Sequence, residues 1–244
     1  MAAAGELGEI PECAIFADTG DEPASVYAWL DWLEKQLPFP VYRVTAGVLS
    51  DEACRVRMSG KSGLSYMKPA LPVFYKGDHI GIGGRQCTMN HKIDPIRKKL
   101  RELHQGRGVV QWIGISMDEV IRMKPSRDSW CVNAWPLIDR GMTRRDCLKW
   151  MDAKGYPKPP RSACVYCPYH SNAEWRRLRD DEPHEFARAV DFEKRLQAAA
   201  AQATALRSKP FLHRSCVPLS EAPLADDDGQ PSLFGNECEG MCGV

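Results

Sequence analysis

A strand–helix–strand pattern over residues 13–44 constrains the fold of this chain most. Residues 13–17 form a short apolar run that ends in the polar segment 18–23, which is typical of a buried strand followed by a loop. From Ser25 onward the apolar residues have helical spacing, and prolines end this segment before a second apolar run at 41–44. Two strands joined by one helix are the unit of a parallel sheet, so the pattern predicts an α/β fold.

The rest of the chain adds helices, one more strand and one irregular segment. By the same spacing rules, helices are expected at 94–104, 143–154 and 173–207, and a strand at 109–115. The last helix is expected to break near Pro183. Ser116 is followed three residues later by Glu119, a capping-box pattern that would start a further helix. Residues 50–68 are polar and rich in glycine and serine, so we expect a mobile loop there.

Ten cysteines stand out in a composition that is otherwise ordinary for 244 residues. The formal net charge is +1, which excludes a general electrostatic attraction to nucleic acid or to an anionic membrane. The first residues lack the pattern of a signal peptide, and no apolar run is long enough to span a membrane, so we expect a cytoplasmic protein. Because the cytosol keeps thiols reduced, clustered cysteines there more often bind metal or react than form disulfides.

The cysteines with the clearest metal-binding pattern are Cys164 and Cys167, which form a Cys-x-x-Cys pair. Cys87 and Cys147 lie upstream, and four thiolates can hold one metal centre. Thiolates select zinc and iron–sulfur clusters, and the ligand type does not decide between the two. The alternative for Cys147 is a half-buried packing residue, because it lies on the helix expected at 143–154.

The order and spacing of four further segments give the most specific signal. These segments are Ile-Phe-Ala-Asp-Thr-Gly at 15–20, Arg-Gln-Cys-Thr at 85–88 with Lys92 and Pro95, Gly-Ile-Ser-Met-Asp-Glu-Val-Ile-Arg at 114–122, and 136–170. Together they resemble the phosphoadenosine phosphosulfate (PAPS) reductase-like branch of the adenine nucleotide α-hydrolase superfamily. The resemblance is closest to phage and prophage forms and to the sulfurtransferase of DNA phosphorothioation.

The resemblance implies a doubly wound parallel sheet with C-terminal helices. Such a sheet would bind ATP or a PAPS-like adenine nucleotide with Mg at the carboxyl ends of its strands. Family members carry a Ser-Gly-Gly-x-Asp-Ser phosphate loop about 30 residues before the Asp-Thr-Gly loop, the usual size of a βαβ unit. The sequence contains no such motif, so we expect a form that lacks the first strand and this PP-loop.

The resemblance also implies roles for individual residues. The nucleotide would be bound by Asp18, Thr19, Gly20, Arg85, Lys92 and Arg122. A 4Fe–4S cluster, or zinc as the alternative, would be held by Cys87, Cys147, Cys164 and Cys167, with Cys131 as the fallback for Cys147. The candidates for a catalytic sulfur nucleophile are Cys238 and Cys242, although the tail does not reproduce the family's Glu-Cys-Gly-Leu-His ending. For Asp18 the alternative is a plain loop cap after a strand.

The sequence thus predicts an iron–sulfur-dependent adenine-nucleotide enzyme of sulfur transfer or substrate adenylation. Its expected parts are a nucleotide-binding domain at 1–170, a helical region at 171–221 and a loose acidic tail at 222–244. Nucleic acid is one candidate for the sulfur acceptor and a partner protein is one candidate for the sulfur source, and the sequence leaves the acceptor and the oligomeric state open. The alternative is a non-catalytic binding subunit of a modification or defence complex, stabilised by zinc or an iron–sulfur cluster.

Overall fold

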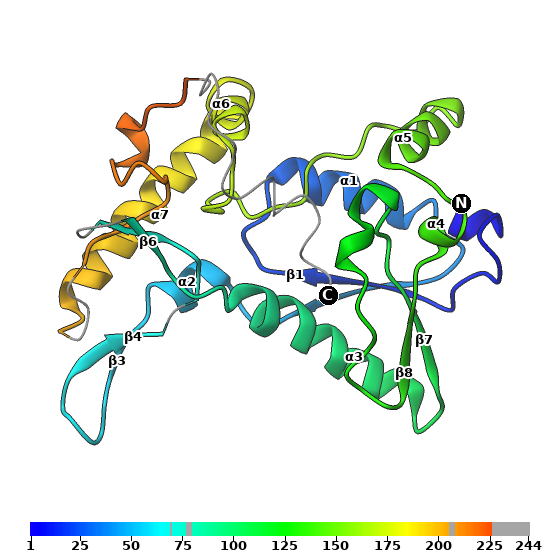
Figure 1. Cartoon of the computed structure of the whole chain (residues 1–244), viewed down its shortest axis with the longest axis horizontal. Helices are drawn as coiled ribbons and strands as arrows, with labels where there is room; N and C mark the ends of the chain where they lie inside the picture. Colours follow the sequence, from blue (N-terminus) through cyan, green and yellow to red (C-terminus); the bar gives the residue numbers. More distant parts are fainter. Residues whose placement is uncertain (69, 77–79, 205–207, 226–244) are drawn as a thin grey trace.

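The computed structural model describes residues 1–68, 70–76, 80–204 and 208–225. The described chain forms a mixed α/β structure of helices and short strands (Figure 1). In this view the half at the right holds α1, α3 to α5, β1, β7 and β8, and the half at the left holds α6, α7 and the short strands β3, β4 and β6. The predicted nucleophiles Cys238 and Cys242 lie outside the described residues.

Two parallel strand pairs form the right half. β1 (Ala14–Asp18) pairs with β2 (Val41–Thr45), and α1 (Ala24–Glu34) connects them, which confirms the predicted strand–helix–strand unit. β7 (Val109–Trp112) pairs in parallel with β8 (Cys131–Ala134). These are separate two-stranded sheets in the described part of the chain, so the prediction of one doubly wound sheet is not confirmed.

Four longer helices lie where the spacing of apolar residues placed them. They are α3 (Asp94–His104), α5 (Arg144–Ala153), α6 (Asn172–Asp181) and α7 (Pro183–Gln202). α5 begins with a capping box in which the Thr143 hydroxyl accepts a 3.3 Å hydrogen bond from the Asp146 amide. Proline at the start of α7 fits the first turn, where no amide donor is needed. No helix in these described ranges is both long and apolar enough to cross a membrane.

The prediction of a mobile loop over 50–68 is wrong. This segment forms α2 (Leu49–Ala53) and an antiparallel hairpin of β3 (Val56–Met58) and β4 (Ser65–Met67). Its polar residues find partners on the C-terminal end of α7: the Ser65 hydroxyl donates to the Gln202 carbonyl over 2.6 Å. Such distant partners order the segment despite its loop-like composition.

The predicted capping box at Ser116 is also absent. Residues Met117–Arg122 form a short 3-10 helix without a side-chain cap. The Ser116 hydroxyl instead donates to the Asp118 carboxylate over 3.1 Å, and Glu119 forms an ion pair with Arg122. The other described elements are the 3-10 helices Ala2–Ala4 and Leu219–Glu221, β5 (Phe74–Lys76), β6 (Ile80–Ile82), a π-helical turn (Met89–Ile93), α4 (Pro136–Asp139) and β9 (Pro210–Phe211).

The largest cluster of buried side chains joins the C-terminal helices to the middle of the chain. It contains Leu49 and Leu71 together with Trp175, Phe192 and Leu212. This cluster crosses the boundary expected at residue 170, so α6 and α7 share one core with residues 49–73. Tyr166 and Cys164 belong to the same cluster, which places the Cys-x-x-Cys segment at the edge of that core.

Candidate functional site: a thiol cleft

Three of the four predicted metal ligands line one small cleft, which we call the thiol cleft. Its walls come from α2, the segment before β5, the π-helical turn and the segment that follows residue 160. The lining residues are Leu49, Leu71, Pro72, Arg85, Cys87, Thr88, Lys92, Cys164, Cys167, Pro168 and Tyr169. The structure therefore brings Cys87 to the Cys-x-x-Cys pair from a position about 80 residues earlier in the sequence.

The Cys-x-x-Cys segment forms a tight turn. The Cys167 amide donates to the Cys164 carbonyl over 3.0 Å, and the His170 amide donates to the Cys167 carbonyl over 3.0 Å. The His170 side chain folds back, and its Nε2 donates to the Cys164 carbonyl over 3.0 Å. Burial lowers the pKa of His170 to about 3, so this imidazole is a neutral support for the turn at physiological pH.

The Asp-Thr-Gly loop after β1 lies against this turn. Gly20 has a φ of 76°, and a Cβ there would lie 3.1 Å from a methyl carbon of Val48, so the position requires glycine. Asp18 accepts hydrogen bonds from the Gly20 amide over 2.8 Å and from the Tyr27 hydroxyl over 2.7 Å. Thr19 is fully buried, and its Oγ1 lies 3.3 Å from the Cys164 Sγ. Asp18 thus acts as a loop cap, while Thr19 contacts the candidate metal ligand.

A buried carboxylate, Asp21, ties the same loop to the cysteine turn. It accepts hydrogen bonds from the Tyr166 hydroxyl over 2.6 Å and from the Ser50 amide and hydroxyl over 2.9 and 3.1 Å. Burial, with the nearby Cys164 thiol and the Asp21 carboxylate, raises the pKa of Tyr166 well above 10, so this phenol stays a hydrogen-bond donor. Sequence reasoning missed Asp21, although it lies in the acidic segment directly after β1.

Lys92 lies on the cleft wall, with its ammonium beside a buried carboxylate. Its Nζ is 3.5 Å from Glu22 Oε1, and the two side chains are 8% and 1% exposed. Burial raises the pKa of Glu22, and the Lys92 charge opposes that rise. Arg85, the other predicted phosphate ligand in the cleft, lies 5.4 Å from the centroid of the Tyr169 ring. The cleft therefore carries two cations next to its thiols.

Three other predicted residues lie elsewhere. Cys147 lies on α5, near the amino group of Met1 and the carboxylate of Asp118. The fallback ligand Cys131 lines a second cavity, and Arg122 pairs with Glu119 on the 3-10 helix. Neither Cys147 nor Cys131 is among the residues that line the thiol cleft, so this arrangement supplies neither as a fourth ligand.

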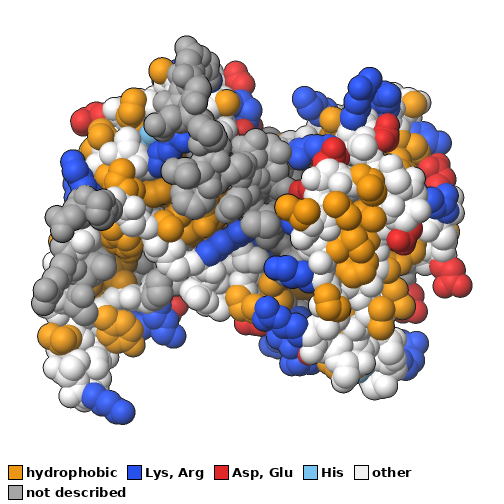
Figure 2. Space-filling model, viewed as in Figure 1, with side chains coloured by type: hydrophobic (Ala, Val, Ile, Leu, Met, Phe, Trp, Pro, Cys, Tyr) orange, Lys and Arg blue, Asp and Glu red, His pale blue; other side chains and the backbone are white. Residues whose placement is uncertain are grey.

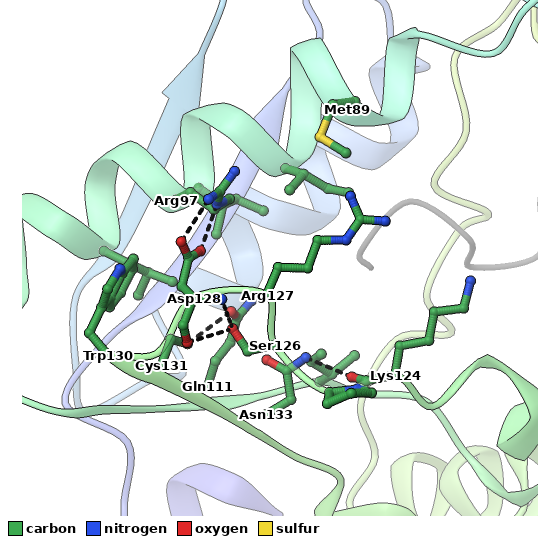
Figure 3. Close-up of a pocket in the computed structure, with 15 residues that line it drawn as sticks. Met89, Arg97, Gln111, Lys124, Ser126, Arg127, Asp128, Trp130, Cys131 and Asn133 are labelled. Carbon is green, nitrogen blue, oxygen red and sulfur yellow. Dashed lines mark hydrogen bonds and ion pairs between the residues drawn. The ribbon is translucent and has the colours of Figure 1, made fainter.

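The second cavity lies between α3, β7 and β8, and we call it the α3–β8 cavity (Figure 3). Its volume is about 140 Å³. The lining residues are Met89, Ile93, Ile96, Arg97, Leu100, Gln111, Ile113, Lys124, Pro125, Ser126, Arg127, Asp128, Trp130, Cys131 and Asn133. The π-helical turn separates it from the thiol cleft, because Lys92 lines one and Met89 and Ile93 line the other.

Positive charge gathers near both hollows. Figure 2 shows Lys and Arg side chains near the middle of this face, beside the depression between the two halves of the molecule.

The chain matches no family model, no curated protein sequence and no solved structure at a significant level. The assignment of function therefore rests on the sites themselves.

Proposed function

We propose that this chain is a PAPS reductase-like enzyme that uses an iron–sulfur cluster and an adenine nucleotide for sulfur transfer or substrate adenylation. One observation carries the proposal: Cys87, Cys164 and Cys167 line the same cleft as Arg85 and Lys92, at the carboxyl end of β1. Thiolates bind thiophilic metal, and adjacent cations attract phosphate or sulfate groups. Nucleotide sites of parallel α/β proteins lie at such strand ends.

The donor chemistry of the thiol cleft fits a cluster or a zinc ion in ligand type. Cys87, Cys164 and Cys167 would be three of its ligands. A fourth ligand is not among the residues that line the cleft, and no group of three or more His, Cys, Asp or Glu side chains in the described ranges is positioned to hold a metal ion. When bound, a cluster would supply electron transfer or an iron site that polarises the substrate.

The chain's own residues would bind and orient an anionic nucleotide beside the thiols. Arg85 and Lys92 supply positive charge, and burial of Lys92 next to Glu22 fixes the position of its ammonium. Nucleic acid is the acceptor that we favour, because α3 carries a basic, solvent-facing surface with Lys98 and Arg101.

Metal analysis of protein purified without oxygen tests the proposal. We expect about four irons and four sulfides per chain, with loss of iron in Cys87→Ser, Cys164→Ser and Cys167→Ser. Cys147→Ser and Cys131→Ser are matched controls that should keep the metal. The same preparations are assayed for release of AMP or pyrophosphate from ATP and for turnover of PAPS, with Cys238→Ser and Cys242→Ser testing the predicted nucleophiles. Metal-free protein without nucleotide turnover would reject the proposal.

A non-catalytic binding subunit is the second candidate. It is favoured by the burial of Cys164 within the main cluster of buried side chains, because structural metal sites are closed and belong to the folded core. Stoichiometric zinc without iron, together with no ATP or PAPS turnover, would support this alternative. The cysteine variants would then lose stability rather than activity, because a structural zinc site contributes directly to folding.

A further inference from the structure

The α3–β8 cavity has one apolar wall and one polar wall. Ile93 of the π-helical turn and Ile96 and Leu100 of α3 form the apolar side. Gln111 and Asn133, which are paired in register on β7 and β8, place amide groups on the other side. An apolar cavity of about 150 Å³ admits a benzene ring, so a cavity of about 140 Å³ has room for one planar ring.

Ion pairs hold the loop that closes this cavity. Arg97 Nε and Nη2 each donate to the Asp128 carboxylate over 2.7 Å, which is a bidentate pair between α3 and the loop before β8. The Asn133 amide donates to the Lys124 carbonyl over 2.9 Å at the other end of the same loop. The cavity walls are therefore preformed rather than assembled by a ligand.

The charges around the cavity are unbalanced. Its lining residues include the three cations Arg97, Lys124 and Arg127 and the single carboxylate Asp128. Asp128 is engaged by Arg97 and Arg101, whereas Lys124 and Arg127 have no carboxylate within ion-pair distance among the described residues. Figure 3 shows the Lys124 and Arg127 side chains extending to the same side of the cavity. A negative group placed there would meet two cations.

We propose that the α3–β8 cavity binds a planar ring that carries an anionic group. The ring lies between the α3 side chains and the amides of β7 and β8, and its carboxylate or phosphate faces Lys124 and Arg127. An aryl carboxylate and a nucleotide monophosphate share this chemistry. The site is separate from the thiol cleft and does not depend on the function proposed for it.

Methyl NMR of the full chain with labelled isoleucines tests this proposal. Phenyl phosphate is the main probe, because its ring current shifts any methyl group that it stacks on. We expect titrated shifts at Ile96 and Ile113, which line the cavity, and none at Ile15 of β1 or Ile80 of β6. Benzyl alcohol, a neutral ring, should bind more weakly, and inorganic phosphate should not shift these methyl groups.

Charge variants test whether Lys124 and Arg127 bind the anionic group of the ligand. The double variant Lys124→Gln/Arg127→Gln should weaken phenyl phosphate binding about tenfold at low salt, while Lys149→Gln on the exposed part of α5 should change it less than about twofold. Parallel titrations with benzoate and AMP distinguish the two sources of ligand. Absence of shifts at Ile96 and Ile113 with every probe would overturn the proposal, as would unchanged affinity in the double variant. AMP shifts at Ile96 and Ile113 that survive in Arg85→Gln would support a nucleotide as the ligand of this cavity, and benzoate shifts without AMP shifts would support an aryl carboxylate.

Discussion

The hydroxyl of Thr19 lies 3.3 Å from the thiol of Cys164, although 145 positions separate the two residues in the sequence. This contact joins the loop after β1 to the Cys-x-x-Cys turn. Because Thr19 is fully buried and Cys164 is 9% exposed, the pair sets the distance between the end of the strand and the candidate metal ligand.

Thr19→Val keeps the side-chain shape and removes this hydrogen bond, together with the one that Thr19 Oγ1 accepts from the Asp21 amide over 3.4 Å. We expect a loss of about 1–3 kcal/mol in the free energy of unfolding, because two buried hydrogen bonds are lost. The Cys164 thiol should also react faster with an alkylating reagent, measured by mass spectrometry of its peptide. Thr19→Ser keeps the hydroxyl and is the matched control. An unchanged alkylation rate in Thr19→Val would show that the contact does not position Cys164.

Tyr166→Phe removes the 2.6 Å hydrogen bond to Asp21 while it keeps the ring stacked on Phe192 at a centroid distance of 3.8 Å. A buried carboxylate that loses a donor costs about 1.5–3 kcal/mol. We expect a loss of that size in urea unfolding, together with weaker metal retention by the cysteine turn. Tyr66→Phe on β4 is the control and should change stability by less than about 0.5 kcal/mol. Equal effects of the two substitutions would contradict the role assigned to Asp21.

Lys92→Met tests the buried ion pair with Glu22. Removal of one partner leaves a buried charge, so we expect a loss of about 3–5 kcal/mol at neutral pH. The double variant Glu22→Gln/Lys92→Met should recover much of this loss, because no charge is then stranded. Urea unfolding of the wild type, both single variants and the double variant gives the coupling energy.

The same pair predicts a pH dependence. Burial raises the pKa of Glu22, and Lys92 opposes this rise, so Lys92→Met should raise that pKa further. A carboxyl with a raised pKa holds its proton more tightly in the folded state, and stability therefore falls as the pH rises through that pKa. The variant should lose stability relative to the wild type as the pH rises above 4.5, the ordinary pKa of this carboxyl, and the double variant should not. If the difference in stability between Lys92→Met and the wild type did not change with pH, a stranded Glu22 carboxylate would be excluded as the cause.

The sequence predicted the elements whose signal is local. β1, α1 and β2 follow from apolar runs separated by turn residues, and α5 follows from the helical spacing of its apolar residues and the glycine after it. β8 was missed because Cys131–Ala134 is only four residues long and does not alternate polar and apolar residues. The hairpin β3–β4 was missed because its partners lie on the distant end of α7. In each of these failures, tertiary contacts override a weak local preference.

The candidate site likewise contains residues that the sequence identified and residues that only the fold reveals. Resemblance selected Cys87, Cys164 and Cys167, and the structure gathers them in one cleft. It also selected Cys147, which the fold places near Met1 instead. The spacing of residues along a chain does not determine which face of a helix lines a given cleft. Asp21 and Glu22, which pair with Tyr166 and Lys92, belong to no recognisable sequence motif. The α3–β8 cavity is likewise formed by three elements whose contacts are not encoded in any short motif.

The ion pair that closes the α3–β8 cavity gives a last prediction, in which stability changes with pH in the direction opposite to that expected for Glu22. Hydrogen bonds from Arg97 hold the pKa of Asp128 below its usual value of 3.8. A carboxyl with a lowered pKa contributes stability above its unfolded-state pKa and loses it as the pH falls through the folded-state pKa. Asp128→Asn should therefore cost about 1 kcal/mol at pH 6, a value discounted for the partial exposure of Arg97.

That cost should shrink when unfolding is measured below pH 3.8, because the wild-type carboxyl is then becoming protonated as well. Asp191→Asn on the exposed face of α7 is the control, and we expect a small effect at both pH values because its pair with Lys194 is solvent-exposed. A cost for Asp128→Asn that grows as the pH falls would contradict the ion pair as the source of its stability. The variant should also weaken phenyl phosphate binding, since the loop that carries Lys124 and Arg127 would no longer be held against α3.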